Sequence, residues 1–351
     1  MSDQEEETVT GTEEEEAAVE EQQEEVEEEG EEEEKVEEEE EEEEKIPENP
    51  LTPEMVAESL TLLCKIGDGL SHAYVRVDLH DRELSDIKIL EKYIHLRFVD
   101  VSRNRLKDIS SLNSLTHLLT LKADENLLTT AQLEEMPYLQ VASFNNNKIM
   151  STEGITHPLI EQISLNFNEI KKVEYLDGDK LARLHTLELR GNKLETTDGI
   201  FLPNLRNLFL AQNTIKTIEG MEHLTHLTTL HLRENQIEKL DGFTDSLVNL
   251  QYINLRGNNI TDVKETQKLQ CLPMLRALAL SENPISEEDD YRMEVLIALR
   301  KLERLDKDEY TDDERQEAED IYEQRRAEQL AAEGAEEVIG SDVDGEDDEQ
   351  D

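Results

Sequence analysis

The sequence predicts an α/β solenoid of about ten tandem units, with a parallel sheet along its concave side. Three observations lead to this prediction. An asparagine recurs nine times between residues 104 and 283, at intervals of 21 to 25 residues. Apolar residues stand eight, five and three positions before each asparagine and two positions after it. Tryptophan is absent, so the core must be aliphatic. A unit this short can bury its apolar side only by stacking on its neighbours.

The repeated motif is L-x-x-L-x-L-x-x-N-x-L, which is the leucine-rich repeat signature. The L-x-L pair should form a short strand whose alternate side chains point inward. We therefore expect a leucine-rich repeat horseshoe in which the asparagine amides bond to neighbouring backbone groups as a structural ladder. The nine ladder residues are Asn104, Asn126, Asn147, Asn168, Asn192, Asn213, Asn235, Asn258 and Asn283. A weaker unit, with Arg82 in place of the asparagine, precedes them.

Both ends of the array carry predicted caps. Thr52 followed by Pro53 is typical of a helix start, and we expect an N-terminal capping helix over residues 51–72. The repeat array should cover residues 73–289, and a C-terminal cap should cover residues 290–310. A charged helix is expected over residues 311–334, because its first turn is acidic and Gly334 should stop it.

The chain has a net charge of −52, concentrated at its two ends. Residues 1–50 hold 28 acidic residues and two lysines, and residues 307–351 hold 20 acidic and four basic residues. Such compositions favour disorder, so we expect acidic disordered tails over residues 1–50 and 335–351. The first tail either keeps the chain in solution or acts as an electrostatic arm for a basic partner. A surface this acidic repels phosphate, which argues against binding to nucleic acid.

Composition and spacing argue against several further classes of protein. No apolar run approaches the roughly 20 residues of a membrane span. Cys64 and Cys271, the two cysteines, do not form a disulfide framework or a cysteine zinc site. The repeat frame places His223 and His226 on the convex return and His231 on a strand, so we expect no metal site there. Because catalytic motifs are lacking, the sequence predicts a non-enzyme without cofactor or small-molecule substrate.

The best candidate binding site lies on the later strands of the predicted concave face. Residues six, four and two positions before each asparagine should face outward there. Arginine and aromatic residues, which are common at the energetic centres of interfaces, gather at these positions. The predicted partner-binding residues are Arg190, Arg233, Arg256, Phe209, His231 and Tyr252. Two alternatives remain open: the arginines pair with strand neighbours such as Glu188 and Glu234, or they hold the chain's own acidic tail.

Several segments of the predicted array resemble the leucine-rich repeat proteins of axonemal radial spokes. The segments that carry the resemblance are Leu62–Lys65, Gly69–Val75, Tyr93–Arg97, Leu115–Leu119, Pro137–Gln140, Leu187–Asn192 and Leu227–Arg233. The similarity extends from about Leu51 to Tyr310. The C-terminal cap, with Leu302 and Leu305 closing the core, also resembles that of the 22-residue, phosphatase-regulator subclass of repeats.

The resemblance implies a non-catalytic scaffold of the third radial spoke in motile cilia and sperm flagella. The implied partners are radial spoke head proteins, and the implied location is the cytoskeleton of the axoneme. Two other functions fit an acidic repeat protein. A regulatory subunit of a type 1 protein phosphatase would hold the enzyme on the concave face. An acidic histone-binding chaperone would use its tails, although the longest acidic run here precedes the array.

Overall fold

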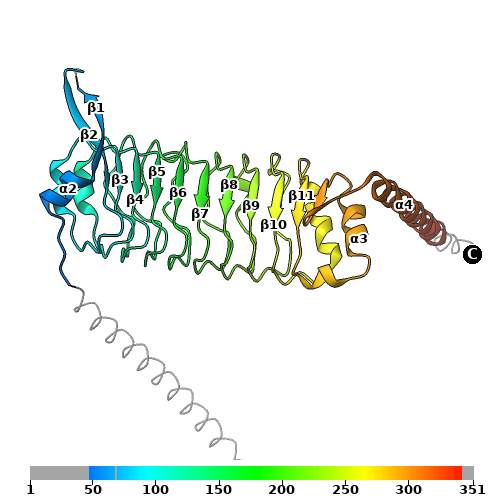
Figure 1. Ribbon diagram of the computed structural model, residues 1–351. Helices are drawn as coiled ribbons and strands as arrows, with labels where there is room; N and C mark the ends of the chain where they lie inside the picture. Colours follow the sequence, from blue (N-terminus) through cyan, green and yellow to red (C-terminus); the bar gives the residue numbers. More distant parts are fainter. Residues whose placement is uncertain (1–46, 68, 342–351) are drawn as a thin grey trace, which may run out of the picture. The chain divides into compact units, whose positions relative to one another are not determined.

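The computed structural model describes residues 47–67 and 69–341. These residues form a 13-stranded open sheet whose strands lie side by side in the order of the sequence (Figure 1). The parallel strands are β2 (Ser71–Asp78), β3 (Phe98–Asp100), β4 (Thr120–Lys122), β5 (Val141–Ser143), β6 (Gln162–Ser164), β7 (Thr186–Glu188), β8 (Asn207–Phe209), β9 (Thr229–His231), β10 (Tyr252–Asn254), β11 (Ala277–Ala279) and β12 (Arg304–Leu305). An antiparallel strand borders each edge: β1 (Leu60–Ile66) and β13 (Asp308–Glu309).

The ten predicted units correspond to strands β2 to β11, so the predicted solenoid is confirmed. In the nine units with an asparagine, the strand covers the positions six to four residues before it, one residue earlier than L-x-L suggested. The register keeps equivalent residues opposite one another, as in Leu208, Leu230 and Ile253. The motif thus sets both the length and the alignment of each strand.

The asparagines form the predicted ladder, and Asn213 shows its geometry. The Nδ2 group of Asn213 donates to the carbonyl oxygens of Leu210 in its own coil and Leu189 in the preceding coil, both at 3.0 Å. Its Oδ1 accepts the backbone N–H of Leu194 at 3.1 Å. The amide therefore satisfies backbone groups that the turn out of the strand leaves unpaired, which explains why a buried polar residue recurs here.

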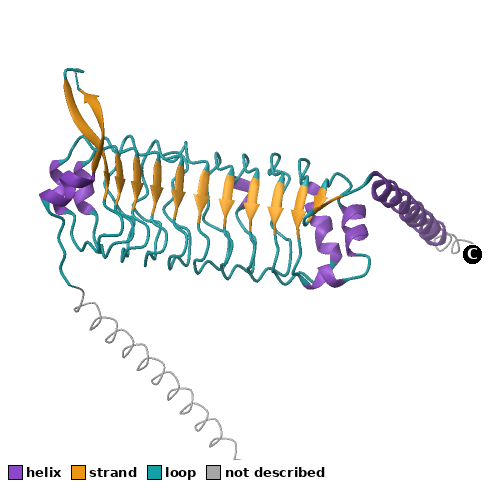
Figure 2. Cartoon of the chain, viewed as in Figure 1, coloured by secondary structure: helices purple, strands orange, loops and turns teal. Residues whose placement is uncertain are grey.

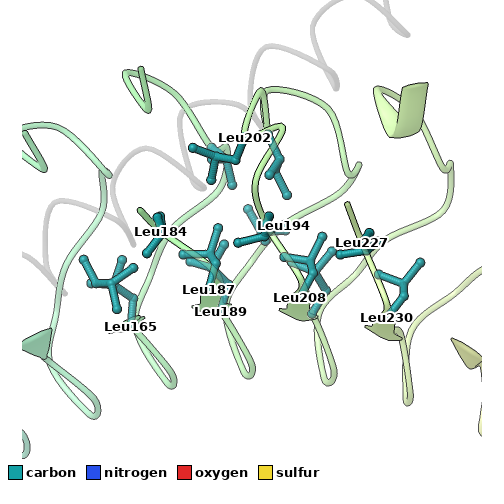
Figure 3. Close-up of a cluster of buried hydrophobic side chains, with 14 of the residues drawn as sticks. Leu165, Leu184, Leu187, Leu189, Leu194, Leu202, Leu208, Leu227 and Leu230 are labelled. Carbon is teal, nitrogen blue, oxygen red and sulfur yellow. The ribbon is translucent and has the colours of Figure 1, made fainter. Parts of the chain in front are cut away.

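Leucine and isoleucine side chains fill the space between the sheet and the return segments. Figure 3 shows Leu187, Leu208 and Leu230, which hold the same place in three consecutive coils. All three are fully buried. Burying one such side chain contributes about 1.5–3 kcal/mol, so the stacked coils share one continuous core.

The return segments on the other side of the core are mostly turns, drawn in teal in Figure 2. Short 3₁₀ helices occur in some of these coils and make the return tight. They are η1 (Lys88–Lys92), η2 (Ser110–Ser114), η3 (Met221–His223), η4 (Val263–Cys271) and η5 (Pro284–Glu287). Gly242 has a φ of 94°, and a Cβ there would lie 1.9 Å from the carbonyl oxygen of Ile218. That return therefore requires glycine.

The predicted N-terminal helix over residues 51–72 is wrong beyond its first two turns. Helix α2 (Pro53–Ser59) begins as expected, with Thr52 Oγ1 accepting the backbone N–H of Met55 at 3.3 Å. The chain then enters β1 and returns as β2. Gly67 and Gly69 both have positive φ in the turn between the strands, and Leu60 lies opposite the buried Val77. Two glycines so close together favour a hairpin over a helix.

The C-terminal end is capped by helix α3 (Tyr291–Ala298) and the strands β12 and β13. Leu302 and Leu305 are buried there, as predicted. Helix α4 (Asp312–Ser341) follows and runs past Gly334, so the predicted stop at that glycine is wrong. Within the described ranges, no helix is long and apolar enough to cross a membrane. Most of the predicted N-terminal tail and residues 342–351 of the C-terminal tail lie outside the described residues.

Candidate functional site

Polar side chains on the first half of the sheet face form a second ladder. They stand two positions before the ladder asparagines. Asp124 Oδ1 accepts the backbone N–H of Asn145 at 2.7 Å, and Asn145 Oδ1 accepts that of Asn166 at 2.8 Å. Asn166 Oδ1 then accepts the N–H of Arg190 at 2.8 Å. These side chains connect successive coils, so their side-chain oxygens are already used in hydrogen bonds within the fold.

The second ladder ends where the predicted site begins. From the coil of Asn213 onward, the equivalent positions hold Ala211, Arg233 and Arg256, whose side chains do not continue it. The sequence separates the later strands, which carry arginine and aromatic residues, from the earlier ones, but it was not used to predict bonds between coils at the earlier positions. The recurrence of Asp124, Asn145 and Asn166 at the same offset in three consecutive coils is the signal that could have indicated this second ladder.

The three predicted aromatic residues lie together across neighbouring strands. We call Phe209, His231 and Tyr252 the aromatic platform. The rings of Phe209 and His231 are stacked, with centroids 4.7 Å apart and planes 17° apart. The rings of His231 and Tyr252 meet edge to face, with centroids 5.3 Å apart. Each side chain is half-buried. The platform is therefore a rigid apolar surface that needs little ordering when a partner binds.

The imidazole of His231 lies at the centre of the platform. Burial lowers its pKa below the usual 6.5, and the nearby charge of Arg233 lowers that pKa further. The ring is therefore neutral at physiological pH, which suits stacking against Phe209 and contact with an apolar partner.

Two of the predicted arginines pair with glutamates near the sheet face. Arg233 Nε lies 3.1 Å from Glu234 Oε1, and Arg256 forms an ion pair with Glu282. The alternative of pairing within the chain therefore holds for both, with Glu234 as one of the predicted neighbours. Exposed pairs of this kind contribute only about 0–1 kcal/mol, so a partner's carboxylate can compete for the same guanidinium groups.

Arg190 has a different environment. Its Nε donates to Gln212 Oε1 at 2.9 Å, and its guanidinium lies 5.2 Å from the centroid of the Phe167 ring. Phe167 in turn covers Gly191, where a Cβ would approach the ring to 2.4 Å. Glu188, the other predicted neighbour, accepts instead from Asn166 Nδ2 at 2.8 Å. Within the described residues, Arg190 forms no ion pair, so its charge is available to a partner.

The histidines of the H-x-x-H motif have structural partners. The Nδ1 of His226 lies 2.9 Å from the carbonyl oxygen of Pro203, and Asn249 makes the equivalent bond in the next coil. His223 meets the ring of Phe201 edge to face. In the part of the chain that the structure describes, no group of three or more His, Cys, Asp or Glu side chains could hold a metal ion.

Comparisons with known proteins agree with this architecture. The family model described as leucine-rich repeat matches residues 182–335. Leucine-rich repeat-containing protein 23 from Bos taurus is 56% identical over 272 residues, which are 78% of this chain and 80% of the relative. The protein of the same name from Homo sapiens is 55% identical over 280 residues, or 80% and 81% of the two chains. The Xenopus tropicalis protein is 52% identical over 283 residues, again 80% and 81%.

A solved structure supports the fold alone. The crystal structure of a TLR13–ssRNA13 complex matches with a TM-score of 0.52 and 20% identity, over 70% of this chain and 40% of that one. The relatives carry a far stronger relationship, because their identity exceeds half over four-fifths of both chains. The chain belongs to the family of leucine-rich repeat-containing protein 23.

Proposed function

We propose that this protein is a non-catalytic scaffold of axonemal radial spokes, at the head of the third spoke in motile cilia and sperm flagella. It binds other spoke proteins through the face of its sheet and supports flagellar motility. The cellular setting of the proposal comes from the sequence resemblance to radial spoke proteins. The binding mode comes from the sheet face. Family membership supports the coarser part, a leucine-rich repeat protein that binds proteins.

The aromatic platform is the observation that carries the binding mode. Its three rings cover adjacent strands, and Arg190 and Arg233 lie beside them on the same face. Stacked aromatic side chains with neighbouring arginines are typical of the energetic centre of a protein interface, because they bury much area and lose little conformational entropy. On a chain of net charge −52, these arginines also give the site a local charge unlike the rest of the molecule.

A set of substitutions on the platform tests the binding mode. Changing Phe209, His231 and Tyr252 to Ser should weaken binding to a purified spoke-head fraction at least about tenfold. The change of Arg190, Arg233 and Arg256 to Glu should do the same. A matched control changes three exposed aromatic residues outside the sheet, Tyr138, Tyr175 and Phe201, to Ser. If the control weakens binding as much as the platform variant, the sheet face is not the binding site.

Fractionation of detergent-stripped axonemes tests the cellular setting. The protein should stay with the axoneme at moderate salt and leave together with spoke proteins under harsher extraction. Release with the soluble matrix, or enrichment in nuclei, would remove the radial spoke proposal. Co-purifying phosphatase activity or histones would then favour the phosphatase regulator or the histone chaperone.

A further inference from the structure

The hairpin of β1 and β2 presents an exposed face that none of the interactions described above uses. The register places Thr61, Leu63 and Lys65 opposite Arg76, Tyr74 and His72. Residues opposite each other, and alternate residues along a strand, share one side of an antiparallel pair. We call these six residues the hairpin face. Figure 1 shows β1 and β2 extending beyond the ends of the neighbouring strands.

All six side chains of the hairpin face are exposed. Leu63 is 57% exposed and Tyr74 is 48% exposed, and these two lie opposite each other at its centre. The alternate residues Val75 and Val77 point the other way and are buried. The hairpin therefore packs against the core through its other side. A paired leucine and tyrosine left in solvent form an apolar centre that the fold itself does not need.

The charges around this apolar centre have one sign. Lys65 and Arg76 flank Leu63 and Tyr74, and the hairpin face holds no acidic residue. Within the described residues, Lys65, Arg76 and His72 form no ion pair. The guanidinium of Arg76 lies over the ring of Phe98 on the next strand, 4.9 Å from its centroid. The chain has 87 acidic and 35 basic residues, so a face with basic but no acidic residues differs from its average composition.

The next residue on the same side of β2 is Asp78, which lies outside the hairpin face and has a partner farther along the chain. Asp78 Oδ1 lies 2.5 Å from Nδ1 of His80, and that hydrogen bond lowers the pKa of Asp78 and raises the pKa of His80. Asp78 is therefore already engaged beyond the hairpin face.

We propose that the hairpin face docks an acidic segment of another protein, with one or two apolar side chains seated on Leu63 and Tyr74 and flanking carboxylates on Lys65 and Arg76. Opposite charge steers such a segment to the face, and apolar burial holds it there. The proposal stands independently of the radial spoke function.

A second copy of this chain fits the face poorly. A symmetric dimer through this face would bring like cations together, because both partners would use the same patch. Each copy also carries a net charge of −52, which repels another copy at a distance. An acidic partner with apolar anchors meets neither obstacle.

The docking is through side chains rather than through an added strand. Leu62 has a φ of 60° in the middle of β1, a conformation that bulky residues rarely adopt. This residue interrupts the edge of β1 where an incoming strand would need regular hydrogen bonds. An incoming segment therefore meets the hairpin face itself.

The test selects peptides on the intact chain from a phage library of random 12-residue sequences. Enriched peptides should carry Asp or Glu next to Leu, Phe or another large apolar residue. Leu63→Ser with Tyr74→Ser should lower their affinity at least about tenfold, and so should Lys65→Glu with Arg76→Glu. Leu62→Ser is the matched control: it removes a leucine of similar exposure, 49%, from the same strand but outside the hairpin face, and should change affinity less than about twofold.

Some results would overturn the proposal, and others would assign the hairpin face to a different occupant. Enrichment of neutral or basic peptides, or an equal loss in Leu62→Ser, would overturn the proposal. A dimer seen by light scattering that dissociates in the Leu63→Ser variant would assign the face to a second copy. A synthetic peptide with the sequence of residues 13–44, rich in glutamate and poor in apolar residues, should compete weakly. Strong competition by it would point to the chain's own acidic segment.

Thermal melts of the variants should match that of the parent chain, because all the changed residues are exposed.

Discussion

The buried imidazole of His157 couples the stability of the array to pH. His157 is 2% exposed, and its Nδ1 accepts the backbone N–H of Met136 at 3.2 Å. Burial lowers its pKa from 6.5 to about 4. The folded state therefore holds the ring neutral, while the unfolded chain binds a proton below pH 6.5. The stability that this residue contributes is complete above pH 6.5, is lost as pH falls from 6.5 to 4, and totals about 3 kcal/mol.

Urea unfolding of the parent chain and of His157→Gln checks this expectation. Gln can still accept the Met136 N–H, but it does not titrate. Between pH 7 and pH 4, the parent chain should lose up to about 3 kcal/mol more unfolding free energy than His157→Gln loses. Carboxylates titrate equally in both proteins and cancel. A difference that does not change with pH would show that His157 has the same pKa in the folded and the unfolded chain.

The asparagine ladder makes a second prediction at the scale of one side chain. Asn213→Ala leaves the backbone N–H of Leu194 without a partner inside the core. It also removes one of the two asparagine amides that donate to each of the carbonyl oxygens of Leu189 and Leu210. We expect a loss of about 1–3 kcal/mol in unfolding free energy. Asn259→Ala is the matched control, since Asn259 is exposed and adjacent to ladder residue Asn258, and its effect should stay within about 0.5 kcal/mol. Equal losses of unfolding free energy in the two variants would mean that the hydrogen bonds of Asn213 do not stabilise the array.

Single-residue features differ in how visible they are in the sequence. The ladder asparagines were predictable because each one sits in a fixed apolar frame that repeats nine times. The contact of Phe209, His231 and Tyr252 was predictable in outline, because the repeat frame puts them on adjacent strands. The second ladder through Asp124 and Asn145 was not predicted, because its side-chain-to-backbone bonds depend on the offset between coils. The buried state of His157 likewise depends on packing across two returns.

Among the secondary-structure elements, α4 is docked to α3 through its first turns. Arg292 Nε lies 2.6 Å from Glu314 Oε1, and Arg325 Nη2 lies 2.6 Å from Glu294 Oε1. Bonds from Arg292 and from Thr311 lower the pKa of Glu314 to about 2. Ala318 is buried, and its small side chain lets the helix approach the cap. The helix is therefore held by a close apolar contact with ion pairs around it.

Limited trypsin digestion tests this docking. Ala318→Asp buries a charge without a partner, so α4 should separate from the cap, and cleavage at Arg325 and Arg326 should become at least about tenfold faster. Ala331→Asp is the matched control, because Ala331 is exposed on the same helix and lies away from both cleavage sites. Fragments from the repeat array should not increase in either variant. If the two variants are cleaved at the same rate, α4 is not docked through Ala318.

The elements at the two ends were harder to predict than the repeats between them. Thr52 and Pro53 correctly marked the start of α2, but its length was overestimated. The apolar residues of 60–66 fit a helical stripe about as well as a strand when taken alone. The turn glycines Gly67 and Gly69 decide between them, together with the pairing of Leu60 with Val77. Each of the nine units with an asparagine can be compared with eight others, which corrects a wrong assignment. A terminal element occurs once and allows no such comparison.

At the scale of the whole array, each coil interacts mainly with its two neighbours, as the strand pairing shows. The surfaces along such an array are physically linked through the stacked core, the paired strands and the hydrogen bonds between neighbouring coils. The hairpin face lies on β1 and β2, and the aromatic platform lies on β8 to β10. With a strand spacing of about 4.8 Å, the seven steps from β2 to β9 separate them by about 34 Å.

That separation predicts that the two surfaces bind their partners independently. It exceeds the Debye length of about 8 Å at physiological salt, so charges bound at one surface do not reach the other. With an enriched acidic peptide saturating the hairpin face, the affinity of the platform for a spoke-head fraction should change by less than about twofold, as measured by surface biosensor. The Leu63→Ser, Tyr74→Ser variant should retain platform binding, and the platform variant should retain the peptide. Mutual exclusion would mean that one partner spans both surfaces, whereas independence means that the array can join two proteins at once.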